Sequence, residues 1–311
     1  MQDLPVKQKY RGVIVPMVTP LDEGGDVDAK AVRVLVDTLV REGCAPFVAG
    51  TTGEAPSLTE EGRVELVRAA AAATDGRAPV YAGIADNCLA GCLRRARLYR
   101  DLGADVAVCH LPGYYPIDEA EMAVWYRALA DACPLPLMLY NIPATTGLSL
   151  PLRLVDELSR HENVVGVKDS ERGDERLREA LALWRDREDF TFHLGWAAKS
   201  AFGLLNGLDG IVPSSGNLVP GLYRRMVERA GAGDAAEAGR LQALTDDISA
   251  CYQEGRSLSR SIPVLKAMLS AFGLCGPAVA PPMMAVAGGE LAAIVAEART
   301  RWAPHVRPIE G

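Results

Sequence analysis

The chain has 311 residues, a net charge of −7 and a hydrophobic content of 49%. A chain of this length and hydrophobicity can bury a large core, which excludes intrinsic disorder and leaves room for one barrel-sized domain with a helical appendage. The acidic balance argues against a nucleic-acid or membrane-surface partner, because the lysines and arginines are scattered among acidic residues.

Short apolar segments typical of strands alternate with longer amphipathic or alanine-rich segments typical of helices. The predicted strands are residues 12–17, 45–49, 80–83, 105–110, 137–140, 164–168, 190–195 and 210–213. The predicted helices are residues 28–42, 59–74, 87–103, 118–132, 150–161, 174–184, 197–206 and 220–230. This alternation predicts an α/β fold, a (β/α)8 TIM barrel, with its active site at the carboxyl ends of the strands.

A doubly wound open sheet is the alternative fold. Residues 18–25 (VTPLDEGG), after the first strand, lack the G-x-G-x-x-G phosphate turn of a dinucleotide-binding sheet. From about residue 233 the pattern becomes helical only, with predicted helices at 234–253, 258–272 and 289–301. We therefore expect a barrel catalytic domain over residues 10–232 and a C-terminal helical region over residues 233–311.

Features of secretion, membrane insertion and metal binding are missing from the sequence. Residues 1–9 contain no apolar signal segment and no run of eighteen apolar residues follows, which predicts a soluble, cytoplasmic protein. The cysteines lack a C-x-x-C pair, and we expect them to be reduced and buried. Cys88 and Cys92 lie one helical turn apart, and His110 and His193 lie at the ends of two apolar runs, but no compact ligand cluster results, so we expect no metal and no cofactor.

Lys168 is the most informative residue. The residues before it, 164–167 (VVGV), indicate a strand buried on both faces, so the lysine lies at the point where such a strand opens into a site. An amine in that setting can lose its proton and attack a carbonyl carbon. The residue alone also fits an ordinary solvated lysine at a strand end.

Two further segments follow strands that end at the same mouth of the barrel: residues 50–54 (GTTGE) and 139–147 (LYNIPATTG). The turn at Gly50 can present backbone amides and the hydroxyls of Thr51 and Thr52 to a carboxylate, and Tyr140 supplies a hydroxyl for proton transfer. Together with Lys168 they are what a 2-oxo acid requires: an amine for the ketone, donors for the carboxylate and a proton carrier.

These residues resemble the pyruvate-dependent class I aldolases typified by dihydrodipicolinate synthase and N-acetylneuraminate lyase. The resemblance runs from about Tyr10 to Pro282. Its motifs are residues 12–20 (GVIVPMVTP), 50–54 (GTTGE), 112–116 (PGYYP), 140–143 (YNIP), 166–170 (GVKDS) and 210–214 (GIVPS). It implies a barrel with a helical C-terminal region, assembled as a homotetramer that is a dimer of dimers.

The resemblance also implies roles for individual residues. Lys168 would form the Schiff base with pyruvate, Tyr140 would transfer protons with Thr51, and Thr52 would bind the pyruvate carboxylate. Tyr115 would reach across the dimer interface to complete the relay of the neighbouring site. Gly195 and Val212 match positions whose backbone would line the substrate pocket, and Gly50 is a further candidate for substrate binding.

Two departures from the family pattern bear on the second substrate. Thr145 stands where dihydrodipicolinate synthases carry the arginine that holds aspartate semialdehyde, and residues 195–198 (GWAA) lack the acidic pair of neuraminate lyases. Both favour an aldolase that cleaves a short hydroxylated 2-oxo acid, of the 2-keto-3-deoxy sugar acid or 4-hydroxy-2-oxoglutarate type, to pyruvate and an aldehyde. Ser170 and Ser214 are candidates to bind substrate hydroxyls.

Three other functions stay open at this stage. The same lysine could support a keto-deoxy sugar acid dehydratase, or the chain could be a dihydrodipicolinate synthase despite Thr145. A barrel without turnover that binds a small oxo acid is the non-enzymatic alternative.

Overall fold

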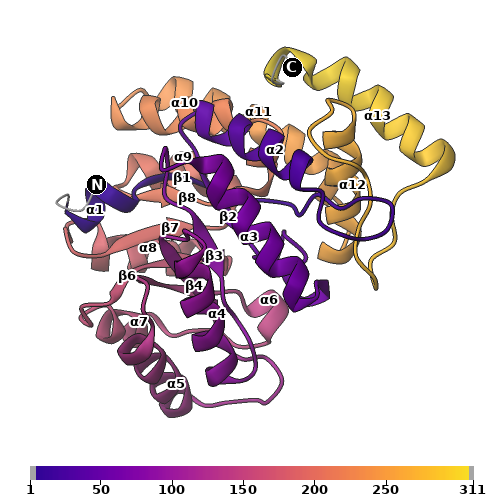
Figure 1. Ribbon diagram of the computed structural model, residues 1–311. Helices are drawn as coiled ribbons and strands as arrows, with labels where there is room; N and C mark the ends of the chain where they lie inside the picture. Colours follow the sequence, from indigo (N-terminus) through magenta and orange to yellow (C-terminus); the bar gives the residue numbers. More distant parts are fainter. Residues whose placement is uncertain (1–4, 308–311) are drawn as a thin grey trace.

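The computed structural model describes residues 5–307 and has a closed eight-stranded barrel at its centre (Figure 1). Every strand pairs in parallel with its neighbours in chain order, and β1 pairs with β8 to close the ring. The strands are β1 (Gly12–Pro16), β2 (Ala45–Val48), β3 (Tyr81–Gly83), β4 (Val106–His110), β5 (Leu137–Asn141), β6 (Val164–Asp169), β7 (Thr191–Leu194) and β8 (Gly210–Ile211). The predicted (β/α)8 barrel is confirmed.

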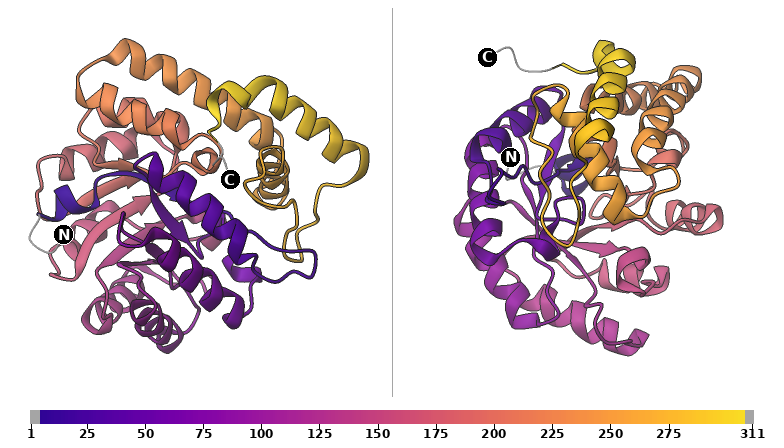
Figure 2. Two further views of the ribbon diagram at one scale, coloured as in Figure 1. Left: turned by 45° about the horizontal axis from the view of Figure 1, so that its top comes forward. Right: turned by 90° about the vertical axis from the view of Figure 1, so that its right-hand side faces the viewer.

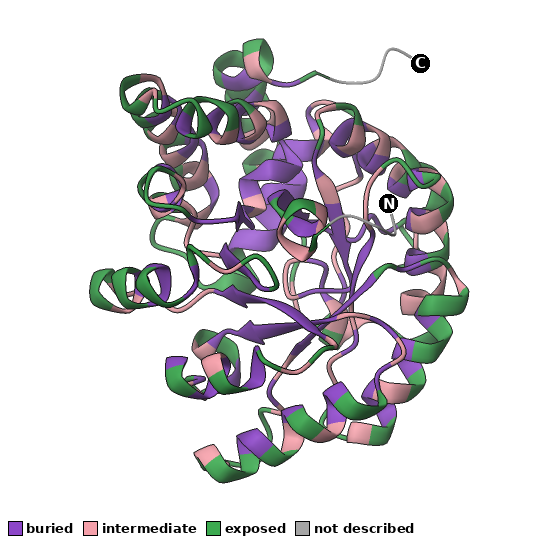
Figure 3. Cartoon of the chain, turned by 90° about the vertical axis from the view of Figure 1, so that its left-hand side faces the viewer, coloured by how far each residue is buried: buried purple, intermediate pink, exposed green. Residues whose placement is uncertain are grey.

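The strands are buried on both faces, which is why they are continuous apolar runs in the sequence. One apolar cluster fills the inside of the barrel and includes Ile14, Phe47, Val108 and Tyr140. A second, larger cluster lies between the strands and the surrounding helices. Figure 3 shows the strands as the buried centre, with the exposed residues on the outer sides of the helices.

The helices around the barrel are α2 (Ala29–Arg41), α3 (Glu60–Thr74), α4 (Leu89–Asp101), α5 (Glu119–Ala132), α7 (Leu152–Leu158), α8 (Asp174–Trp184), α9 (Ser200–Leu205) and α10 (Pro220–Gly231). Side-chain caps fix several of their starts: Asp28 and Thr59 accept backbone N–H groups, and Asp118 forms a capping box with Glu121. Two short helices were not predicted, α1 (Val6–Tyr10) and α6 (Pro143–Thr146).

After β8 the described chain is helical, and its three long helices gather on one side of the barrel (Figure 2). They are α11 (Ala235–Gln253), α12 (Leu258–Ser270) and α13 (Gly288–Trp302). Helix α12 is the most buried of them, with an unbroken run of buried residues from Ser261 to Leu269. Helix α10, the last helix of the predicted barrel domain, packs directly on α11, the first helix of the predicted C-terminal region. No separation between two domains is visible there, so the boundary at residues 232 and 233 stays a prediction. Residues 1–4 and 308–311, which belong to the predicted N-terminal and C-terminal regions, lie outside the described residues.

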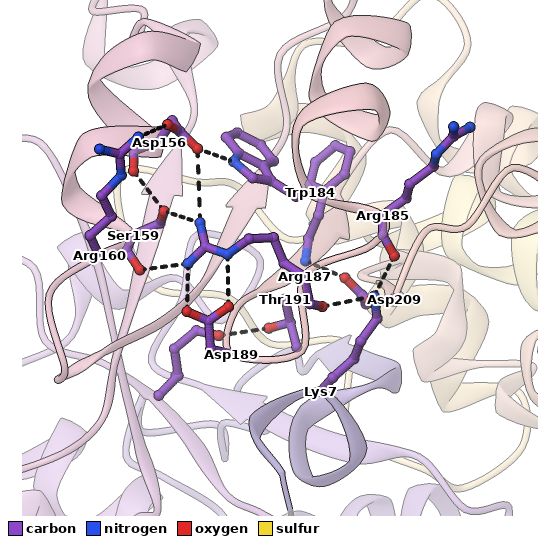
Figure 4. A network of polar contacts seen from close by, with 12 residues as sticks. Lys7, Asp156, Ser159, Arg160, Trp184, Arg185, Arg187, Asp189, Thr191 and Asp209 are labelled. Atoms are coloured by element: carbon purple, nitrogen blue, oxygen red, sulfur yellow. Dashed lines mark hydrogen bonds and ion pairs between the residues drawn. The ribbon is translucent and has the colours of Figure 1, made fainter.

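A polar network closes the face of the barrel where the strands begin (Figure 4). Arg187 binds Asp189 with two parallel hydrogen bonds of 2.7 and 2.8 Å and donates to Ser159 at 2.8 Å. Lys7 of α1 lies 3.2 Å from the carboxylate of Asp209, which also accepts the backbone N–H of Phe192. These contacts connect α1 and the segments before β7 and β8, so this face stabilises the fold and leaves the opposite face for function.

All seven cysteines are free, as expected, but not all are buried. Cys88 is exposed and Cys251 is only partly buried, which corrects that part of the prediction. Cys88 is the N-cap residue of α4, outside the packed face of that helix, and Cys251 lies in the last turn of α11. Within the described chain, no helix combines the length and apolar character needed to span a membrane.

Candidate active site

Three functional side chains lie side by side because their strands pair in register. His110 of β4 is paired with Tyr140 of β5, and Tyr140 is paired with Lys168 of β6. Residues paired in this way point to the same side of a sheet, so all three face the inside of the barrel near its carboxyl end. The ring of Tyr140 meets the ring of His110 edge to face, with centroids 6.1 Å apart.

Lys168 exposes only 4% of its surface. Its Nζ lies 3.9 Å from the ring centroid of Tyr140 and 4.8 Å from that of Phe47. No carboxylate of residues 5–307 forms an ion pair with this amine. The sequence-based expectation of a buried lysine at the mouth of an apolar barrel therefore agrees with the geometry.

The turn after β2 brings a second hydroxyl to Tyr140. Thr51 Oγ1 lies 3.4 Å from the Tyr140 hydroxyl. The ends of the turn have unusual backbone angles, because Ala49 and Glu54 adopt left-handed conformations with φ of 52° and 59°. Non-glycine residues in that region are strained and persist where the surrounding structure holds them.

Close backbone packing supports this turn and the loop after β6. A Cβ atom on Gly83 would lie 2.1 Å from the carbonyl oxygen of Ala49, so only glycine permits β3 to approach the turn. A Cβ atom on Gly195 would lie 2.1 Å from the hydroxyl of Ser170. Gly195 and Ser170 are thus in direct contact beside Lys168.

A buried ion pair anchors the far side of the turn. The Glu54 carboxylate lies 2.8 Å from Nζ of Lys266 on α12, and neither side chain is exposed. Glu54 also accepts the backbone N–H of Ala280 at 2.7 Å, and Lys266 donates to the carbonyl of Thr19 at 2.8 Å. The C-terminal helices therefore hold the turn that carries Thr51 and Thr52.

A second network lies behind Lys168, on the outer side of the barrel. Asp169 accepts a hydrogen bond from Asn141 at 2.8 Å and pairs with Arg176 at 2.8 Å. Burial raises the pKa of the Asp169 carboxyl, and the Arg176 charge opposes this shift. Because Asn141 and Asp169 follow Tyr140 and Lys168 directly, the network fixes the strand ends that carry them.

A cavity of about 270 Å³ opens beside Tyr140 and Thr51. His110 forms part of its wall, and Arg63 and Arg95 from α3 and α4 line another part. Both arginines are already paired with Glu60. The cavity has the size for a small metabolite.

The remaining predicted site residues have varied surroundings. Thr52 is partly buried, and Val212 is buried inside the barrel with its N–H bonded to Leu194. Thr145 is exposed on α6, and Tyr115 is 71% exposed beside Tyr114.

Ser214 turns toward α11. Its hydroxyl lies 2.7 Å from the hydroxyl of Tyr252 and accepts a hydrogen bond from Gln253. Its predicted contact with substrate stays a prediction. Across the described part of the chain, no group of three or more histidine, cysteine, aspartate or glutamate side chains could hold a metal ion.

The sequence profile of the Dihydrodipicolinate synthetase family matches residues 9–299. The chain belongs to this family. Its members are pyruvate-dependent class I aldolases and lyases, and this chain is an enzyme of that class.

Curated relatives in the family include the 4-hydroxy-tetrahydrodipicolinate synthases of Xylella fastidiosa and Xanthomonas axonopodis pv. citri. They are 33% and 35% identical to this chain, and each match covers 85% of both sequences. The solved dihydrodipicolinate synthase of Bacteroides thetaiotaomicron superimposes with a TM-score of 0.88 at 31% identity, covering 93% of this chain and 98% of that one. YagE of Escherichia coli K12, solved in complex with pyruvate, gives a TM-score of 0.87 at 27% identity, with 94% and 98% covered.

Two residues beside the site are not predicted from the sequence as part of it. His110 appears there only as a possible metal ligand, although its place at the end of an apolar strand indicates that it faces the barrel mouth. Lys266 was not singled out, since nothing in the sequence pairs it with Glu54, 212 positions earlier.

Proposed function

We propose that the protein forms a Schiff base between Lys168 and pyruvate and reversibly cleaves a short hydroxylated 2-oxo acid to pyruvate and an aldehyde. The observation that carries this proposal is the buried Lys168 amine, covered by the rings of Tyr140 and Phe47 and next to the Tyr140–Thr51 hydroxyl pair. A buried amine in its neutral form is a nucleophile toward a ketone, and the two hydroxyls can move protons.

In the cleavage direction, the Lys168 amine adds to the C2 ketone and water leaves, which gives an iminium. Tyr140, with Thr51, takes the proton of the C4 hydroxyl as the C3–C4 bond breaks. The bonding electrons form an enamine of pyruvate, and the aldehyde leaves. Protonation of C3 and hydrolysis of the iminium then release pyruvate and restore the free amine.

Two features support a hydroxylated acid as substrate. Thr145 cannot form the paired hydrogen bonds by which an arginine holds a carboxylate, and its hydroxyl is bonded to the carbonyl of Ile142. Trp196, Ala197 and Ala198 offer no carboxylate for a long amino-sugar. The names of the curated relatives support the second candidate, synthesis of 4-hydroxy-tetrahydrodipicolinate from pyruvate and aspartate semialdehyde.

Borohydride reduction in the presence of pyruvate tests the chemistry. We expect peptide mass mapping to find a reduced pyruvyl adduct on Lys168 and on no other lysine, because the adduct requires an accessible neutral amine. Lys266, which is buried and paired with Glu54, is an internal control within the same digest. An unmodified Lys168 would refute the proposal.

A second assay compares cleavage of 4-hydroxy-2-oxo acids with condensation of pyruvate and aspartate semialdehyde, and faster condensation would favour the second candidate.

We also propose that the protein is a homotetramer in which Tyr115 completes the site of a neighbouring subunit. The support is the exposure of two adjoining tyrosines, 71% for Tyr115 and 73% for Tyr114, because neighbouring exposed aromatic side chains are typical of a surface that a protein partner covers. We expect Tyr115→Phe to lower kcat by about a hundredfold, the range of one proton-transfer group. Pyruvate adduct formation should be nearly unchanged. Tyr114→Phe is the matched control, and equal activity of both variants and the wild type would exclude the relay across subunits.

A further inference from the structure

His110 has one ring nitrogen engaged and the other open. Its Nδ1 lies 2.7 Å from the carbonyl oxygen of Leu111. A carbonyl oxygen only accepts hydrogen bonds, so Nδ1 carries the proton of the neutral ring. Nε2 is then a bare acceptor, and the bond from Nδ1 to Leu111 is the only side-chain hydrogen bond that His110 makes within residues 5–307.

Burial favours the neutral ring, because it lowers the pKa of His110 against the opposing effect of the bond to Leu111. His110 also lines the same cavity as Tyr140 and Thr51. The cavity therefore contains an unpaired, uncharged hydrogen-bond acceptor next to the proposed reacting groups.

The two arginines of the cavity are less available. Arg63 donates to Glu60 and to the carbonyl of Ala55, and Arg95 pairs with both Glu60 and Asp86. Tyr140 connects Lys168 to the cavity, because its ring centroid lies 3.9 Å from Lys168 Nζ and its side chain lines the cavity together with His110. A carbon chain that extends from Lys168 past Tyr140 would therefore enter the part of the cavity that His110 lines.

We propose that His110 is a specificity-determining residue whose Nε2 accepts a hydrogen bond from a hydroxyl on the aldehyde half of the substrate. This inference rests on the proposed function and specifies its substrate: aldehydes with a hydroxyl next to the carbonyl, such as glycolaldehyde and glyceraldehyde. Aldehydes of the same length without that hydroxyl leave the acceptor desolvated and unpaired, which costs transition-state binding.

The test measures kcat/KM for condensation of pyruvate with glycolaldehyde and with acetaldehyde. We expect the wild type to prefer glycolaldehyde by about ten- to a hundredfold, the range for a buried hydrogen bond gained or lost. His110→Phe keeps the ring shape but removes the acceptor, and the preference should fall to about threefold or less, which is within the effect of side-chain shape alone. His110→Gln keeps an acceptor at a similar distance from the backbone and should restore most of the preference.

Exchange of the C3 hydrogens of pyruvate with deuterium separates this inference from the proposed function. The exchange requires Lys168 and the enamine but no aldehyde, so it should be nearly equal in the wild type and both variants. Equal exchange with an unchanged glycolaldehyde preference in His110→Phe would refute the role of His110 and leave the lyase intact. A wild type without preference would do the same. No exchange in the wild type would refute the proposed function and this inference with it.

Discussion

Replacing Tyr140 by phenylalanine should stop carbon–carbon bond cleavage almost completely. We expect kcat to fall by about a thousandfold, because a positioned proton-transfer group contributes on the order of 100- to 10,000-fold. Apart from Thr51, no side chain of the described residues bonds the Tyr140 hydroxyl, and the ring contacts with Phe47, His110 and Lys168 need no hydroxyl. The variant should therefore fold normally and lose chemistry alone.

Steady-state cleavage kinetics and thermal unfolding together check this expectation. Tyr99→Phe is the matched control: Tyr99 is buried on α4, and its hydroxyl has no partner within residues 5–307. It should retain wild-type activity. A kcat of Tyr140→Phe within tenfold of the wild type would mean that another group moves the proton. A large fall in Tm would mean that the hydroxyl supports the fold.

The barrel could be predicted because the burial of its strands and helices produces a regular pattern of apolar and polar residues in the sequence. Parallel strands buried on both faces are short apolar runs, and each lies between helices with a polar outer side. The failures are short elements that depend on distant contacts. Helix α1 has five residues and is held by Lys7 against the segment before β7, and α6 has four residues between β5 and the next loop. Both helices are too short for apolar residues to recur at the helical spacing, so the sequence shows no periodic pattern that would predict them.

The site could be predicted where it depends on topology. Tyr140 and Lys168 lie on the neighbouring strands β5 and β6, and Thr51 follows β2 at the same end of the barrel, so the order and direction of the strands were enough to place them at one mouth. Contacts between the barrel and the C-terminal helices could not be predicted in that way. The hydroxyl of Ser214 bonds Tyr252, and Glu54 binds Lys266, because α11 and α12 pack against the segments that follow β8 and β2. These contacts join residues far apart in the sequence, and no local sequence pattern predicts them.

Removing the charge of Lys266 should produce the largest loss of stability. In Lys266→Met the Glu54 carboxylate stays buried without its partner, and breaking a buried pair from one side costs about 3–5 kcal/mol. The Ala280 N–H would remain its nearest donor, and the Thr19 carbonyl would lose the ammonium group. Urea unfolding should show a clearly lower midpoint. Arg68→Met is the matched control, because Arg68 pairs with Glu65 at the surface, where such pairs contribute little.

The double variant Glu54→Gln with Lys266→Met separates the charge from the packing. If the cost arises from an uncompensated carboxylate, the double variant should be more stable than Lys266→Met, because glutamine keeps an acceptor for Ala280 without a charge.

Both variants should form the pyruvate adduct more slowly, since Glu54 holds the strained end of the turn that carries Thr51. A Lys266→Met protein with a wild-type midpoint would mean that the pair contributes nothing to the fold. Wild-type adduct formation in both variants would mean that the turn is held by its glycine packing alone.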